Sequence, residues 1–414
     1  MRALIASTGS DGDVRPFFAL AKGLAARGHD VRFAAADHYA PGAARYGIPF
    51  EAVGPPWDAA VLETTFRKIL SHSSPLEHIK IVMDSIAEPE RLALPRLMEL
   101  AAESDVVIYP PIFVAAAAAA RAKKVRHVSV QLAPVHPARS YSPTGANLGP
   151  LLNGLLWKAA GAAIRRASDA KLNAIVGEAG LPPWRDVLLR AASSSWLDLI
   201  AVSPEVIQLD PAWPAASRIT GYFFLDEPDF DDAELESFIA GGAPPVIVGF
   251  GSMMGFDARA VTETVLEAVR TLDRNVIVLS GWAGLGGAAP LPHVRVAKFV
   301  PHGWLFPRAA CVVHHGGAGT TAACLRAGVP QSIVWHLGDQ PAWGKRMEKH
   351  GVAPPSLHYK KLTPKALRSR VDRMLSDAAM QTAAKRLGAR ISREDGVAVA
   401  TAMIEDALTK PASA

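Results

Sequence analysis

The chain has few cysteines and no long hydrophobic run. Only Cys311 and Cys324 occur among its 414 residues, which excludes a disulfide framework and favours a reducing compartment. The longest alanine-rich run, residues 115–120, ends at Arg121, far short of the roughly 20 apolar residues that a membrane span needs. Residues 1–7 are too short for the core of a signal peptide and lack a cleavage pattern. We therefore expect a cytoplasmic protein without a membrane span.

Signatures of nucleic-acid and metal binding are also missing. The 44 Lys and Arg residues exceed the 39 Asp and Glu residues, which gives a formal net charge of +5, but no long basic run marks a nucleic-acid site. The excess positive charge favours anionic partners, either a nucleotide or an acidic membrane surface, so peripheral membrane contact stays open. No residues have the spacing of metal ligands, and no Asp-x-Asp pair lies beside a nucleotide-binding strand. We therefore expect no metal and no other cofactor.

The order of apolar segments predicts an α/β protein with two domains, because 414 residues are too many for one ordinary core. In the first half, helical patterns separate the strand-like runs 3–7, 31–33, 106–108 and 127–130. In the second half, the corresponding runs are 246–250, 276–279, 294–299 and 311–313. This alternation is typical of parallel sheets covered by helices. We expect an N-terminal domain over 1–225, a C-terminal domain over 226–390 that begins with a linker at 226–245, and a final helix within 391–414 that returns to the first domain.

The most informative segment is VVHHGGAGTT, residues 312–321. A buried strand leads into two histidines, a glycine-rich turn and two hydroxyls, and an amphipathic stretch from Ala322 to Ala327 follows. Free N–H groups and the positive end of a helix dipole at such a turn form an anion site that suits a diphosphate. The alternative is a tight turn that binds nothing. The histidine pair and the downstream Asp339-Gln340 favour the anion site.

Four sequence blocks together resemble the nucleotide-sugar-dependent glycosyltransferases of the GT-B fold. The blocks are GSDGDVRP (9–16), FGS (250–252), the span from VPH (300–302) through LFPR (305–308) to Thr321, and RAGVPQ (326–331) with GDQPAW (338–343). The most similar groups are bacterial relatives of sterol glucosyltransferases and of glycopeptide-antibiotic glycosyltransferases. The resemblance implies two Rossmann-like domains that face a cleft. The first domain would bind the acceptor, and the second would bind the nucleotide sugar.

The resemblance places the donor's diphosphate at the glycine-rich turn. His315 would donate a hydrogen bond to a phosphate oxygen, and Ser252 would reach the same group from a second strand-to-helix turn. The remaining oxygens would be held by the Thr320 hydroxyl and by backbone N–H groups of Gly317, Ala318, Gly319 and Thr320. The alternative for His315 is a core histidine. His314 points the other way on a regular strand, so we expect it to be structural.

The same resemblance assigns the base and sugar contacts. Phe299, Val300 and His302 occupy the place where the family cradles the nucleotide base, although the strand could simply end at Pro301. Asp339 and Gln340 resemble the pair that holds the hydroxyls of the donor sugar, because carboxylate and amide oxygens accept hydrogen bonds from vicinal hydroxyls. Trp343 either bounds the sugar pocket or belongs to the core.

Asp13 is the catalytic base that the resemblance implies. Transfer with inversion needs a base that takes the proton of the acceptor hydroxyl while the diphosphate leaves. Ser10 is a second candidate that would assist the acceptor. The structural alternatives are a helix N-cap for Asp13 and a turn hydrogen bond for Ser10. The family commonly has arginine where this chain has Asp11, and Asp11 either raises the proton affinity of Asp13 or points to solvent.

The primary hypothesis is an inverting hexosyltransferase that moves glucose from UDP-glucose to a hydroxyl of a lipophilic acceptor, such as a sterol, polyketide or terpenoid. A TDP-deoxysugar donor is the direct alternative, because Ala323 stands where related plant enzymes have an acidic residue that contacts the ribose. A nucleotide-sugar-binding protein without catalysis is a further alternative. An epimerase of similar architecture is disfavoured by the N-terminal block and by Asp339-Gln340. We expect the acceptor to contact variable loops within 57–86 and 134–157.

Overall fold

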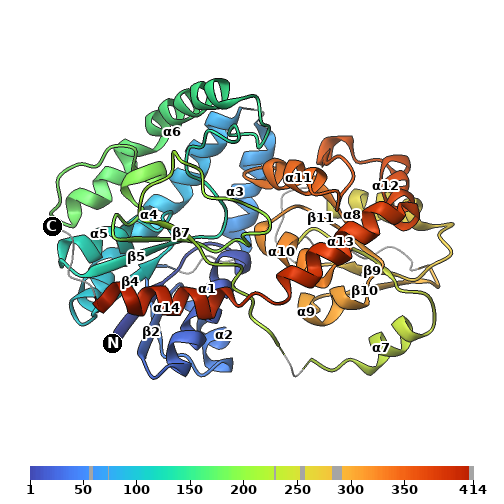
Figure 1. Cartoon of the computed structure of the whole chain (residues 1–414), viewed down its shortest axis with the longest axis horizontal. Helices are drawn as coiled ribbons and strands as arrows, with labels where there is room; N and C mark the ends of the chain where they lie inside the picture. The colour runs from blue at the N-terminus through green and yellow to red at the C-terminus, as the bar shows by residue number, and fades with distance from the viewer. Residues whose placement is uncertain (56–58, 73, 228–229, 252–256, 282–290, 410–414) are drawn as a thin grey trace. The chain divides into compact units, whose positions relative to one another are not determined.

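The computed structural model describes residues 1–414 except for 56–58, 73, 228–229, 252–256, 282–290 and 410–414 (Figure 1). The chain divides into two compact units. Unit 1 contains Met1–Pro143, Asn147–Leu225 and Asp395–Ala414. Unit 2 contains Thr144–Ala146 and Asp226–Glu394.

Within the described residues, unit 1 is built on a seven-stranded parallel sheet in the order β3-β2-β1-β4-β5-β6-β7. Its strands are β1 (Arg2–Ala6), β2 (Asp30–Ala35), β3 (Phe50–Ala52), β4 (Val106–Tyr109), β5 (Arg126–Gln131), β6 (Leu197–Ile200) and β7 (Ser217–Ile219). Its helices are α1 (Asp11–Ala26), α2 (Ala40–Arg45), α3 (Ala59–Ser71), α4 (Pro75–Ala102), α5 (Val114–Ala122), α6 (Pro150–Glu178) and α14 (Gly396–Thr409), with short turns η1 (Asp37–Tyr39) and η2 (Val187–Ala191).

Unit 2 repeats this architecture with a six-stranded parallel sheet in the order β10-β9-β8-β11-β12-β13, again counted over the described residues. Its strands are β8 (Val246–Gly249), β9 (Val276–Leu279), β10 (Val294–Ala297), β11 (Cys311–His314), β12 (Gln331–Trp335) and β13 (Leu357–His358). Its helices are α7 (Ala233–Ala240), α8 (Ala258–Val269), α9 (His302–Leu305), α10 (Ala318–Ala327), α11 (Gln340–Lys349), α12 (Pro364–Ser376) and α13 (Ala378–Ile391), with short turns η3 (Phe306–Arg308) and η4 (Tyr359–Lys361).

The predicted fold class is confirmed, since both units are parallel α/β sheets. The strands β4 and β9 consist wholly of apolar residues, as expected where helices cover both faces of a parallel sheet. In unit 1, two separate apolar clusters lie on the two faces of the sheet. The alanines at 115–120 of α5 are all buried between the sheet and the helices α4 and α6, because such small side chains let a central helix pack closely. No helix among the described residues combines the length and apolar character that a bilayer crossing requires.

The strand order creates one switch point in each sheet. In unit 1, β1 pairs with both β2 and β4, so the chain builds first to one side of β1 and then to the other. In unit 2, β8 pairs with both β9 and β11 in the same way. Ligands of open parallel sheets bind beyond the carboxyl ends of the strands at such points. The segment that follows β1 is therefore the candidate site of unit 1, and the segments that follow β8 and β11 form the candidate site of unit 2.

Two segments are more ordered than their composition predicts. Residues 226–245, expected as a linker, contain α7, whose Leu235 and Phe238 pack against the apolar cluster of unit 2. The Asp232 carboxylate caps this helix by accepting a hydrogen bond from Leu235 N at 2.9 Å. Residues 57–86, expected as a variable loop, contain α3 and the beginning of α4. In both cases the helical spacing of apolar residues is short and lies next to glycine, proline or acidic residues, which indicate a loop.

The C-terminal helix α14 packs on unit 1, where it runs alongside α1 (Figure 1). Its Ala400 and Ile404 join the same apolar cluster as the β1 and α1 side chains. At its far end, the Glu405 carboxylate accepts hydrogen bonds from Arg27 and His29, and these two partners lower the pKa of Glu405 to about 2.

Gly396 provides a test of how α14 is seated. A Cβ at this position would lie 2.5 Å from backbone atoms of Gly221 and Tyr222, so Gly396→Ala should force the helix away from its seat. We expect a loss of about 2 kcal/mol in the free energy of unfolding, measured by urea denaturation. Gly177→Ala in α6 is the control, because a Cβ there meets no atom within 4 Å and the change should be neutral or stabilising. Equal stability of Gly396→Ala and the wild type would contradict this packing.

Candidate active site

His314 ends the central strand β11 and orients the turn that follows. Its Nδ1 accepts a hydrogen bond from Gly316 N at 3.0 Å, so its Nε2 carries the proton and donates to Gln331 Oε1 at 2.9 Å. Burial lowers the pKa of His314 to about 4, which keeps the ring neutral. The geometry agrees with the structural role expected for His314. Gln331, at the start of β12, is a supporting residue that the sequence pattern did not reveal.

His315 lies in a cradle made by two glycines. A Cβ at Gly251 would lie 2.8 Å from His315 Cε1, and a Cβ at Gly317 would lie 2.5 Å from His315 Nε2. Gly251 also has a positive φ of 60°, which favours glycine for a second reason. Within the part of the chain that the structure describes, the buried Nδ1 of His315 has no hydrogen-bond partner. Burial, with His314, His336 and His302 nearby, lowers the pKa of His315 well below its usual value.

The glycine-rich turn leads directly into α10. This helix begins at Ala318, four residues before the amphipathic stretch that the sequence marks. Its first intrahelical hydrogen bond runs from Thr321 N to Gly317 O at 2.9 Å, so the N–H groups of Ala318, Gly319 and Thr320 precede the helical ladder. Gly319 is exposed and Thr320 is half-buried. The turn therefore presents backbone donors and the positive end of a helix dipole beside His315.

Asp339 and Gln340 occupy the start of α11, and both also hold local structure. Asp339 precedes the helix, and its Oδ2 accepts a hydrogen bond from Trp343 Nε1 at 2.7 Å. Gln340 Oε1 accepts from His336 N at 2.7 Å and from Leu337 N at 3.2 Å. Trp343 is only 1% exposed, so its ring supports Asp339 from the core rather than offering a surface to a sugar.

The remaining predicted donor residues differ in their exposure. Phe299 is 56% exposed just before Pro301, whereas Val300 is buried in the apolar cluster of unit 2. The His302 ring stacks on Phe306, with ring centroids 4.4 Å apart. Of the predicted base platform, Phe299 is therefore exposed and Val300 is buried. Ser252 lies outside the described residues.

In unit 1, Asp13 is the third residue of α1 and faces the turn after β1. Its Oδ2 accepts hydrogen bonds from Ser10 N at 2.8 Å and from Ser10 Oγ at 2.9 Å. The N-cap of the helix is Ser10 and not Asp13, which corrects the structural alternative for Asp13. Gly9 makes room for the carboxylate, because a Cβ there would lie 2.6 Å from Asp13 Oδ2. No described residue forms a hydrogen bond with the second carboxylate oxygen of Asp13.

Charges near Asp13 adjust its proton affinity. Asp13 is exposed as a whole residue, but the pKa of its carboxyl is raised. Desolvation by the surrounding turn is the largest cause, the charge of Asp11 adds to the rise, and the hydrogen bonds from Ser10 oppose it. Asp11 is exposed, and its own pKa is raised because partial desolvation outweighs the opposing charges of Arg15 and His38. The charge of Asp11 therefore raises the pKa of Asp13 even though the Asp11 side chain is exposed.

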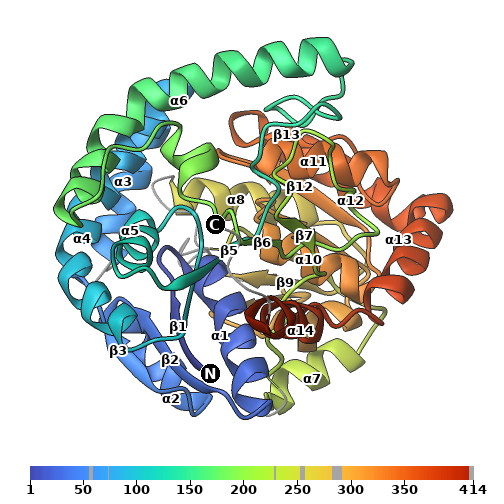
Figure 2. The same ribbon diagram turned by 60° about the vertical axis from the view of Figure 1, so that its left-hand side comes forward.

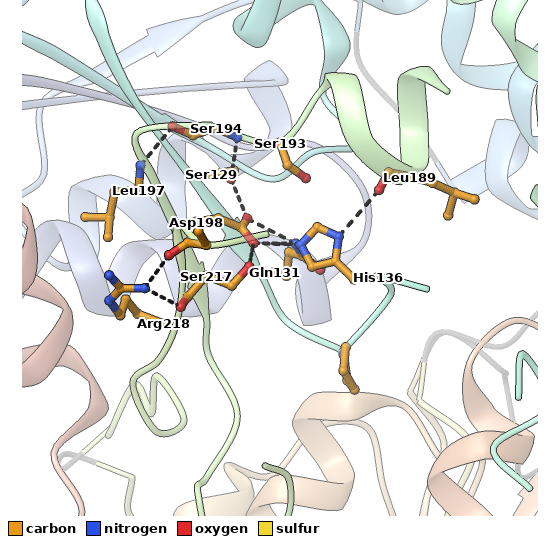
Figure 3. Close-up of polar contacts among 12 residues, drawn as sticks. Ser129, Gln131, His136, Leu189, Ser193, Ser194, Leu197, Asp198, Ser217 and Arg218 are labelled. Atoms are coloured by element: carbon orange, nitrogen blue, oxygen red, sulfur yellow. Dashed lines mark hydrogen bonds and ion pairs between the residues drawn. The ribbon is translucent and has the colours of Figure 1, made fainter. Parts of the chain in front are cut away.

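A buried polar cluster lies near the carboxyl end of β5 in the same unit (Figure 3). Asp198, on β6, is fully buried and its Oδ2 contacts His136 Nε2 at 2.7 Å. The same carboxylate accepts hydrogen bonds from Gln131 Nε2, from Ser129 Oγ and from Ser217 Oγ at 2.5 to 3.0 Å. His136 belongs to the segment after β5, so this cluster fixes the beginning of a predicted acceptor loop to the sheet.

Three further side chains hold the same loop (residues 132–143). Asp210 Oδ2 accepts hydrogen bonds from Arg139 N at 2.9 Å and from Ser140 N at 2.8 Å. Asn153, buried in α6, donates to Arg139 O at 2.8 Å, and Trp157 Nε1 donates to Tyr141 O at 2.8 Å. The conformation of the loop is therefore specified by side chains that lie outside it. Proline and glycine content marks this loop in the sequence but gives no sign of these anchors.

Domain models of known families cover much of the chain. Residues 3–131 match the family model "Glycosyltransferase family 28 N-terminal domain". Residues 263–405 match "Erythromycin biosynthesis protein CIII-like, C-terminal domain". Each of these two matches lies largely within one unit of the structure.

Full-length relatives agree with these matches. O-mycaminosyltylonolide 6-deoxyallosyltransferase of Streptomyces fradiae is 31% identical over 98% of this chain and 97% of its own length. Sterol 3-beta-glucosyltransferase UGT80A2 of Arabidopsis thaliana is 30% identical over 96% of this chain, but the chain spans only 64% of that relative. The crystal structure of the glycotransferase of kitacinnamycin shares the fold, with a TM-score of 0.75 and 20% identity over 98% of this chain and 99% of that one.

The two parallel α/β units and the likeness to the kitacinnamycin glycotransferase define a GT-B fold. The chain belongs to the glycosyltransferase family that combines a family 28 N-terminal domain with an erythromycin CIII-like C-terminal domain. Its family uses a nucleotide-sugar donor and a small-molecule acceptor. Among the described residues, no group of three or more His, Cys, Asp or Glu side chains is arranged to hold a metal ion.

The buried cluster around Asp198 can be tested by Asp198→Asn. The amide keeps the size of the carboxylate but presents an NH2 group to His136, Gln131 or a serine hydroxyl, so buried donors lose their acceptor. We expect a loss of about 3 kcal/mol in the free energy of unfolding, measured by urea denaturation. Asp105→Asn is the matched control, because Asp105 forms an exposed ion pair with Arg2 in the same unit and should change stability little. A similar small effect at both positions would refute the proposed importance of the cluster.

Proposed function

We propose that this chain is an inverting glycosyltransferase that moves a hexose, glucose from UDP-glucose, to a hydroxyl of a lipophilic acceptor. The observation that carries the proposal is the position of His315, held between Gly251 and Gly317 at the start of α10. A buried imidazole nitrogen without a partner among the described residues, next to unpaired helix N–H groups, is suited to a phosphate oxygen.

The donor's diphosphate would bind at this turn. His315 is neutral when the site is empty because its pKa is lowered by burial, and a neutral imidazole still donates one hydrogen bond. An adjacent diphosphate would favour the protonated form, which strengthens the hydrogen bond. The N–H groups of Ala318, Gly319 and Thr320 and the Thr320 hydroxyl would hold the other oxygens, and Ser252 is assigned to the same group. This seat would stabilise the charge of the leaving nucleoside diphosphate without a metal.

The donor sugar would lie near the start of α11. We assign its hydroxyls to Asp339 and to Gln340, whose positions are fixed by Trp343 and by the backbone of 336–337. Phe299 would stack against the base, which agrees with its exposure. Val300 and His302 would contribute to this platform through backbone groups and through packing, respectively.

Asp13 would act as the base on the acceptor side. It would take the proton of the acceptor hydroxyl as the oxygen attacks the anomeric carbon, while the bond between that carbon and the diphosphate breaks. One Asp13 oxygen is occupied by Ser10, and the other is available for the proton. Ser10 would orient this carboxylate instead of contacting the reacting hydroxyl. A raised pKa suits the task, because a stronger base takes the proton of an alcohol more readily.

Two alternatives remain for the donor and the activity. A TDP-deoxysugar is supported by the deoxyallosyltransferase name of the Streptomyces relative and by Ala323, which is buried and brings no acid to a ribose. UDP-glucose is supported by the glucosyltransferase name of the plant relative. A nucleotide-sugar-binding protein without catalysis is the other alternative. A panel of UDP- and TDP-sugars with lipophilic alcohols and phenols, followed by mass detection of the adduct, separates all three.

We also propose a cytoplasmic location. The support is chemical: Cys311 and Cys324 are both buried free thiols, as expected for a protein that works under reducing conditions.

Asp13→Asn should separate chemistry from donor binding. The amide oxygen can still accept from Ser10, so α1 keeps its start, but the group no longer takes a proton. We expect the transfer rate to fall by a factor of about 10² to 10⁴, with the affinity for UDP or TDP unchanged in calorimetry. His315→Ala is the contrasting variant, with nucleotide affinity reduced about tenfold to a hundredfold. Unchanged transfer by Asp13→Asn would refute its role as the base.

Asp11→Asn should shift the pH dependence of transfer. Activity requires ionised Asp13, so kcat/KM falls as the pH drops through the pKa of Asp13. The charge of Asp11 raises that pKa, and its removal should therefore move the acid limb of the profile to lower pH. Asp105→Asn, which removes an equal charge elsewhere in unit 1, should leave the limb in place. A shift of the limb to higher pH in Asp11→Asn would contradict the assignment.

A further inference from the structure

The first half of α6 exposes an unusual set of leucines. We call the leucine patch the five side chains that lie along this half of the helix and just before it, with exposed fractions of 42% to 85%: Leu148, Leu151, Leu152, Leu155 and Leu156. Their spacing of three and four residues places them on one side of a helix. Figure 2 shows this half of α6 extending away from the sheet of unit 1.

The orientation of α6 is fixed by its opposite side. Asn153 is fully buried, where its side chain accepts a hydrogen bond from Leu148 N and donates to Arg139 O and to Asn147 Oδ1. Trp157 also points inward and donates to Tyr141 O. A rotation that buried the leucines would break all of these hydrogen bonds. The helix therefore presents leucines to solvent and a polar residue to the interior, which is the reverse of an ordinary surface helix.

The segment of the sequence that contains the leucine patch is basic. Between Asp105 and Asp169 the sequence contains no Asp or Glu and eight Lys or Arg residues. Lys158, Arg166 and Arg139 are exposed on α6 and on the loop held by Asn153. Across the described residues, none of these three side chains takes part in an ion pair. Leucines flanked by unpaired basic residues fit an anionic lipid surface.

We propose that the leucine patch docks on the surface of an anionic membrane, with the leucines in the acyl boundary and the basic side chains among the lipid headgroups. A second copy of this chain is a poorer partner, because a symmetric contact would bring Lys158 and Arg166 against the same cations of the other copy. Docking does not depend on the proposed transfer reaction. The patch follows the anchored loop 132–143 in the chain. If the proposed reaction is correct, docking would bring the enzyme to bilayers in which a lipophilic acceptor dissolves.

Flotation with lipid vesicles tests the proposal on the full chain. Vesicles of phosphatidylcholine alone are compared with vesicles of equal parts phosphatidylcholine and phosphatidylglycerol. We expect the wild type to float with the anionic vesicles and far less with the neutral ones, and salt should weaken binding. Leu151→Gln/Leu155→Gln should reduce the partition coefficient about tenfold or more, and Lys158→Gln/Arg166→Gln about tenfold.

Leu92→Gln/Leu209→Gln is the matched control, because these two leucines are 57% and 50% exposed in the same unit but lie outside the patch. The control should bind vesicles like the wild type. Failure of the wild type to float, or equal loss in the control, overturns the proposal. A dimer that light scattering detects in the wild type and not in Leu151→Gln/Leu155→Gln, without vesicle binding, would assign the patch to self-association. Transfer to a water-soluble acceptor, measured on the same variants, reports separately on the proposed function.

Discussion

The site in unit 2 depends on one steric constraint, the confinement of the His315 ring between two glycine backbones. A side chain on either glycine would overlap the ring, and the positive φ of Gly251 excludes most other residues independently. The strand order makes this contact available, because β8 and β11 are neighbours and their carboxyl ends bring Gly251 and His315 together. The neutral state of the histidine follows from the same confinement, since a ring enclosed by protein is poorly solvated when charged.

A second theme is that side chains assigned to chemistry also hold the backbone. Asp13 uses one oxygen to bind Ser10 at the start of α1. Asp339 accepts from Trp343, and Gln340 fixes the turn before α11. Groups held in this way need little reorganisation when a ligand arrives, which is the condition for effective electrostatic stabilisation. A structural contact of such a side chain is therefore compatible with the functional role proposed for it.

The sequence was sufficient for the fold class and for most strands. The run at 276–279 and the helix at Val114–Ala122 coincide with β9 and α5, because parallel strands and a polyalanine helix have strong local signals. The sequence was insufficient to predict α7 and α3, because their short amphipathic patterns lie next to residues that favour loops. The sequence left two positions open for Trp343, the sugar pocket and the core, and its ring is buried. The contacts of Asp198 with His136 and Gln131 escaped, because they join residues that are more than 60 positions apart in the chain. Periodicity reports local structure, whereas these contacts arise only after the chain has folded.

The anchoring of residues 132–143 affects how this scaffold can diversify. Three of its fixing side chains, Asp198, Asp210 and Asn153, come from outside the loop and from separate parts of unit 1. A foreign loop transplanted here would arrive without these partners and would leave buried carboxylate and amide groups unsatisfied. Ligand preference should therefore change by stepwise replacement of outward-facing side chains while the loop backbone is retained. Chimeras between family members should tolerate the exchange of whole units better than the exchange of this loop.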